Sequence, residues 1–138
     1  MVLPTLAKKT IEMFGISINK IEMQPLLDII DSAITNKNHI QIGVVNAAKI
    51  VNMKKNPSFR QDVLNSDVIL ADGCSIVWAS KILGKSLPER VAGIDLMYRL
   101  LETGNIKKYR IYCHRKNYPN TETLRLHPLA TSPKPGCN

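Results

Sequence analysis

Two residues of this chain combine a reactive side chain with a position suited to chemistry. Asp72 follows the short apolar run 68–71, which is typical of a buried parallel strand, and Gly73 and a helical apolar pattern come next. Open α/β sheets bind their ligands beyond the carboxyl ends of such strands. Asp72 can therefore be a general base, a metal ligand or only a helix cap. Arg90, eighteen residues later in a predicted loop, can clamp a phosphate or be an ordinary surface arginine.

Two further polar residues lie at predicted helix starts. Asn46 directly follows the predicted strand 39–45, where it can cap the helix expected over 47–54 or face a ligand. Asp95 can cap the helix expected to run to about Glu102 or lie near its start. Capping alone is a sufficient explanation for both residues.

Other kinds of site have little support in the sequence. The glycines form neither GxGxxG nor GxxxxGK[ST], so no dinucleotide fingerprint or P-loop is present. The three histidines have no ligand-like spacing, and we expect no metal and no cofactor. The three cysteines are far apart and fit neither a CxxC site nor a disulfide framework, so Cys74 is interpreted as a small buried residue and a reducing cytoplasm as the compartment.

The elements that position these residues alternate along the chain. After a leader, 1–9, a hairpin or bent edge strand is expected around Gly15, followed by a helix over 23–35. The chain then continues with a strand over 39–45 and with helices that begin at 47 and at Pro57. A strand over 67–71, a helix ending near Gly84, a helix ending at 103–105 and a strand over 108–112 follow. This alternation predicts an α/β fold with a parallel or mixed sheet flanked by helices.

The positive charge is concentrated at the end of the chain. Residues 1–106 carry 12 Lys and Arg against 10 Asp and Glu, whereas residues 107–138 carry seven against one. The basic segment contains four of the eight prolines and no sustained apolar period, which is typical of a disordered, solvated tail. A nucleic-acid-binding module is the competing interpretation, but no basic–aromatic platform supports it, and we expect no nucleic acid partner.

One ordered series of motifs resembles a known family. It comprises Asn46-Ala47, Pro57-x-Phe59-Arg60, Asp72-Gly73, VWAS at 77–80 and LPERVAG-x-Asp at 87–95. The series is specific, covers about residues 10–112 and resembles the WecG/TagA/CpsF glycosyltransferases, glycosyltransferase family 26. The resemblance implies a Rossmann-like α/β domain that needs no metal.

The resemblance also implies a reaction and roles for the residues. Family members move an N-acetylmannosamine-type or related sugar from a UDP donor to an undecaprenyl-diphosphate-linked acceptor, with inversion, for teichoic acid or surface polysaccharide. Asp72 corresponds to the proposed general base, Arg90 to an arginine near the donor diphosphate, and Asn46 to a residue of the donor pocket. Asp95 and Gly73 are expected near the substrates. The implied location is the cytoplasm, with peripheral association at the inner face of the plasma membrane.

The sequence departs from the family pattern in two places. Val44 and Val45 replace the Thr-Pro that often precedes the asparagine, which removes a hydroxyl contact with the donor sugar. Residues 113–138 match none of the family's second half, which includes a C-terminal segment thought to complete the site at the membrane. We interpret 10–112 as a partial, truncated domain and 113–138 as the product of a frameshift or early stop. The alternative to transfer is therefore an inactive remnant or a nucleotide-binding protein, and homo-oligomerisation stays open.

Overall fold

The structure is a computed structural model that describes residues 9–88 and 90–112. The chain begins with an antiparallel hairpin of β1 (Thr10–Met13) and β2 (Ile16–Asn19), followed by α1 (Met23–Thr35). Next come β3 (Ile42–Val45), α2 (Ala47–Lys55), α3 (Pro57–Leu64), β4 (Val68–Ala71), α4 (Cys74–Ile82) and α5 (Gly93–Lys107). The predicted hairpin and the predicted helix over 23–35 are both confirmed.

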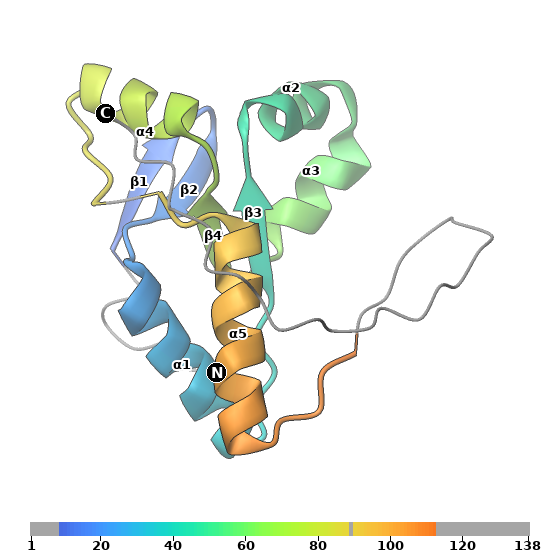
Figure 1. The fold of residues 1–138 in the computed structure, drawn as a ribbon. Coiled ribbons are helices and arrows are strands. Elements are labelled where there is room, and N and C mark those ends of the chain that lie inside the picture. The colour runs from blue at the N-terminus through green and yellow to red at the C-terminus, as the bar shows by residue number, and fades with distance from the viewer. Residues whose placement is uncertain (1–8, 89, 113–138) are drawn as a thin grey trace, which may run out of the picture.

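A parallel pair of strands forms the centre of the described fold (Figure 1). β3 pairs with β4 in a register that sets Ile42 opposite Val68 and Val45 opposite Ala71. The hairpin lies beside the other edge of β4, where the Asn19 side-chain oxygen accepts a hydrogen bond from the Ile69 backbone N–H at 2.7 Å. The predicted mixed α/β fold is therefore confirmed. Two parallel strands do not test the larger Rossmann-like sheet, which stays a prediction.

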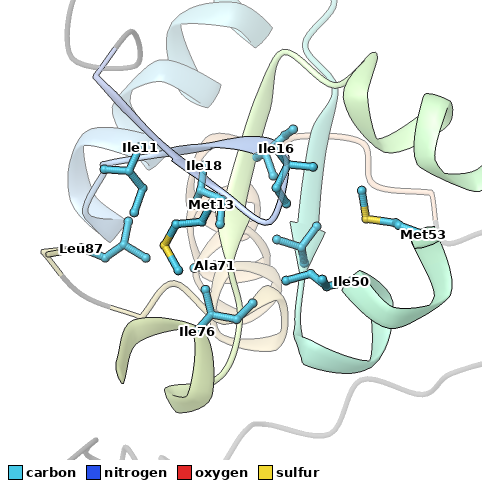
Figure 2. Close-up of a cluster of buried hydrophobic side chains, with 11 residues drawn as sticks. Ile11, Met13, Ile16, Ile18, Ile50, Met53, Ala71, Ile76 and Leu87 are labelled. Atoms are coloured by element: carbon cyan, nitrogen blue, oxygen red, sulfur yellow. The ribbon is translucent and has the colours of Figure 1, made fainter. Parts of the chain in front are cut away.

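β4 divides the core between its two faces. All four of its residues are buried, as expected for a parallel strand covered on both sides. Ile69 and Ala71 belong to a cluster with the hairpin, α2 and α4, whereas Val68 and Leu70 belong to a second cluster with α1 and α5. Figure 2 shows the first cluster, in which hairpin side chains meet Ile50, Ala71 and Ile76. The alternation of a strand's side chains thus fixes which helices cover which face.

The prediction for the end of α5 is wrong in two respects. The helix does not stop at residues 103–105 but continues to Lys107, and residues 108–112 do not form a strand. Gly104 is buried inside the last turns, where a Cβ atom would lie 2.9 Å from Ile111 Cδ1. The glycine therefore permits a close approach of the chain that follows the helix, and it does not act as a stop.

Contacts with α1 explain why the segment after α5 is not a strand. Lys108 takes a left-handed conformation with φ of 58°, and the Tyr109 N–H bonds back to Gly104. Lys107 Nζ lies 2.6 Å from Asp31 Oδ2 on α1, and the Tyr109 hydroxyl donates to the same carboxylate. These bonds hold the segment against the two helices, so tertiary contacts override its strand-like composition.

Apart from Lys9, whose carbonyl accepts the Lys20 N–H at 2.7 Å, the predicted leader 1–9 and the predicted tail lie outside the described residues. Residues 1–8 and 113–138 are not described, so the division at residue 112 stays a prediction. Two predicted strands begin later than expected, at Ile42 and at Val68. The residues just before the two strands bond to each other, because Asp67 Oδ2 accepts a hydrogen bond from the Gln41 N–H at 2.8 Å.

Candidate active site at the carboxyl edge of the parallel pair

Asn46 and Asp72 leave the sheet side by side. Each directly follows a strand of the parallel pair, and the register joins Val45 to Ala71. The Asp72 N–H continues the ladder by donating to the Val45 carbonyl at 2.8 Å. Both residues are partly buried. The strand ends therefore bring a carboxylate and an amide together at the edge where parallel sheets bind ligands, as their sequence positions predicted.

Gly73 provides the turn that separates Asp72 from α4. Its φ of 111° and ψ of 140° lie in a region that side chains other than glycine rarely adopt. Nothing lies closer than 3.8 Å to the position of a Cβ atom there, so the constraint is conformational and not steric. Asp72 thus lies between the strand ladder and a turn that requires glycine.

Asn46 is a helix cap with part of its side chain left over. Its Oδ1 atom accepts the Lys49 backbone N–H at 2.9 Å, which confirms the predicted cap of α2. The cap uses the amide oxygen and leaves the Nδ2 donor out of this bond. A capping role and a ligand-facing role are therefore compatible in one side chain.

Lys49 adds a cation that sequence reasoning missed. Its Nζ atom donates to the Val44 carbonyl at 2.8 Å, so the ammonium lies near the last residues of β3. The available signal was its position three residues after the capping asparagine, in the first turn of α2. This edge therefore carries a positive as well as a negative side chain.

Arg90 and Asp95 form an ion pair at the start of α5. Arg90 Nη2 lies 3.2 Å from Asp95 Oδ2, and the arginine side chain is mostly buried. Asp95 lies in the first turn of the helix and does not cap it, because the cap residue is Ala92. Of the two positions considered for Asp95, the one near the helix start is therefore confirmed.

Packing brings the start of α5 to the same strands. A Cβ atom on Gly93 would lie 3.6 Å from both methyl groups of Val44, two residues before Asn46. Val91 and Ala92 are buried, so the chain that follows Arg90 is firmly seated on this face. Val45 is fully buried. Val44 and Val45, which precede Asn46, thus serve packing.

The described residues offer no site for a metal ion. Within 9–88 and 90–112, no group of three His, Cys, Asp or Glu residues is arranged to hold one. Cys74 is only partly buried, so its interpretation as a buried residue is wrong. In the same described part of the chain, no helix is long and apolar enough to cross a membrane.

A comparison with models of known protein families finds a match to this chain. The model of the family described as "Glycosyl transferase WecG/TagA/CpsF family" matches residues 11–114, which include all the residues discussed above. The chain belongs to the WecG/TagA/CpsF glycosyltransferase family. The predicted resemblance is therefore confirmed, and so is the prediction that the chain is a transferase by family.

The chain is also similar in part to a curated protein of known activity. Over 58 residues the chain is 40% identical to an N-acetylglucosaminyldiphosphoundecaprenol N-acetyl-beta-D-mannosaminyltransferase from Bacillus spizizenii (strain ATCC 23059 / NRRL B-14472 / W23). The match covers 42% of this chain and 23% of the relative, so the chain spans about a quarter of the length of the curated relative that it matches.

Proposed function

We propose that this chain transfers an N-acetylmannosamine-type sugar from a UDP donor to an undecaprenyl-diphosphate-linked acceptor, with inversion at the anomeric carbon. The product would serve teichoic acid or another bacterial surface polysaccharide. The reaction would take place in the cytoplasm, at the inner face of the plasma membrane. Family membership and the printed activity of the Bacillus relative support this assignment.

The observation that carries the proposal is the pairing of strand ends. Asn46 and Asp72 emerge together from β3 and β4 within the region that the family model matches. The backbone of Asp72 is hydrogen-bonded to β3 and is followed directly by the Gly73 turn. An inverting transfer needs such a base on the acceptor side.

In the proposed reaction, the Asp72 carboxylate accepts the proton of the acceptor hydroxyl. The oxygen then attacks the anomeric carbon of the donor sugar, and the bond from that carbon to the UDP oxygen breaks. UDP leaves with the bonding electron pair, and its diphosphate gains negative charge as it departs.

Arg90 is the residue proposed to stabilise that charge. A guanidinium group offers paired N–H donors that suit a diphosphate better than a lysine does. Asp95 holds one nitrogen of Arg90 at 3.2 Å and would orient the rest of the group toward the donor. The Asn46 amide and the backbone beside Gly73 would contact the substrates, and no metal or cofactor would take part.

The test is a transfer assay on the purified 138-residue chain. UDP-N-acetylmannosamine and a synthetic prenyl-diphosphate-linked N-acetylglucosamine are the substrates, and both UDP release and the disaccharide product are measured. We expect product with inverted stereochemistry. If UDP binds by calorimetry but no product forms, the alternative of a nucleotide-binding protein without transfer replaces the proposal. If neither binding nor transfer is measured on folded protein, the inactive remnant is correct.

A further inference from the structure

The outward face of α4 is apolar where a surface helix is normally polar. Trp78 and Ile82 are 50% and 85% exposed, and Leu83 just beyond the helix is 55% exposed. Trp78 and Ile82 are four residues apart, so they lie next to each other on the helix surface. The opposite face, with Ile76, Val77 and Ser80, is buried in the core. Burial in the core therefore does not account for the apolar outward face.

The charged residues of the segment 73–88 are both lysines, and the exposed Glu12 is the acidic neighbour of Lys85. Lys81 and Lys85 are exposed and lie among the apolar side chains, and residues 73–88 contain no Asp or Glu. Lys85 Nζ donates to the Glu12 backbone carbonyl at 2.8 Å, which holds the ammonium in place without neutralising it. Tryptophan and aliphatic side chains bordered by lysines are the composition of helices that lie in the interface of anionic membranes.

The position of α4 connects this face to the proposed reaction. The helix begins two residues after Asp72, and Figure 1 shows it next to the hairpin, at the same end of the described fold as α2. A bilayer in contact with α4 would lie close to the candidate base. The acceptor proposed above is anchored in such a bilayer by its prenyl chain.

We propose that the α4 face, defined as Trp78, Lys81, Ile82, Leu83 and Lys85, docks on the surface of an anionic lipid bilayer. The apolar side chains enter the interface and the two ammonium groups contact lipid phosphates. Its purpose, to bring Asp72 to a lipid-linked acceptor, rests on the proposed function. The binding itself does not, and it can be measured without any substrate.

The experiment uses the chain's own fluorescence, since Trp78 is its only tryptophan. The full chain is mixed with phosphatidylcholine vesicles with or without phosphatidylglycerol, and emission and co-sedimentation are recorded. With phosphatidylglycerol we expect a blue shift, quenching by brominated lipid and sedimentation, all reduced by high salt. The partition coefficient of Ile82→Glu should fall at least ~10-fold, because a charge replaces an apolar side chain at the interface.

The matched control is Ile106→Glu. Ile106 lies in the last turn of α5, is 79% exposed, and undergoes the same chemical change as Ile82. It should bind vesicles like the wild type. The proposal would be overturned if the wild type showed no blue shift, or if Ile82→Glu and Ile106→Glu lost vesicle binding to the same extent. A lipid-free dimer that Ile82→Glu converts to a monomer would also overturn it, because the face would then bind a second copy. Vesicle binding without transfer would leave the docking surface standing and remove the proposed function.

Discussion

Replacing Ser80 by alanine should destabilise the loop that carries Arg90. The Ser80 hydroxyl is fully buried in α4, donates to the Val77 carbonyl at 2.6 Å and accepts the Leu87 N–H at 3.2 Å. Leu87 is itself 3% exposed and belongs to the core cluster of Ile76. Ser80 therefore fixes the buried end of the loop, three residues before Arg90.

The size of the effect follows from what the substitution leaves behind. Without the hydroxyl, the Leu87 N–H loses its partner in a place that water does not reach. An unsatisfied buried donor costs about 1–3 kcal/mol, whereas the removed methylene-sized volume is negligible. We expect Ser80→Ala to lower the free energy of unfolding by about 2 kcal/mol, within that range.

Urea denaturation followed by circular dichroism measures this loss. Ser75→Ala is the control, because it makes the same chemical change on the same helix at an exposed position. Its effect should stay within about 0.5 kcal/mol. If Ser80→Ala lowers the free energy of unfolding by no more than Ser75→Ala does, the buried hydrogen bond does not hold the loop. That result would refute the reasoning.

Three further substitutions test the site. Gly73→Ala should cost about 1–3 kcal/mol of unfolding free energy because of its positive φ, whereas Gly93→Ala, with ordinary contacts, should change it little; equal effects in urea denaturation would contradict this. Asn46→Ala should lose about 1 kcal/mol of cap energy, whereas Asn46→Ser keeps the cap and should reduce only donor binding; calorimetry with UDP separates the two roles. Arg90→Lys should leave stability nearly unchanged, because lysine keeps the positive charge beside Asp95, but weaken UDP binding by roughly 10-fold; unchanged affinity would remove Arg90 from the donor site.

Local sequence signals predicted most of the elements because they act within one turn or strand. The cap at Asn46, Pro57 in the first turn of α3 and the apolar run of β4 each specify structure through neighbouring residues. The same signals place Asp72 and Asn46 at strand ends. The adjacency of the two residues then follows once β3 and β4 pair in parallel.

The local sequence signals do not predict contacts between residues that lie further apart in the chain. Gly104 resembles a helix stop, but it is buried against Ile111, which lies seven residues later. The segment after α5 resembles a strand, but Asp31, far earlier in the chain, binds both Lys107 and Tyr109. The Arg90–Asp95 ion pair and the Lys49 contact with Val44 likewise depend on how loops and helix ends are oriented. Residue type alone does not encode those orientations.

The measurement that tests the central claim most directly compares Asp72→Asn with Asp62→Asn in the transfer assay. Asn is nearly isosteric with Asp but cannot take up the acceptor proton, and Asp62 is an exposed residue of α3 away from the strand ends. We predict that Asp72→Asn folds and binds UDP like the wild type but loses at least ~100-fold in kcat, whereas Asp62→Asn keeps full activity. Transfer by Asp72→Asn at the wild-type rate would contradict the account.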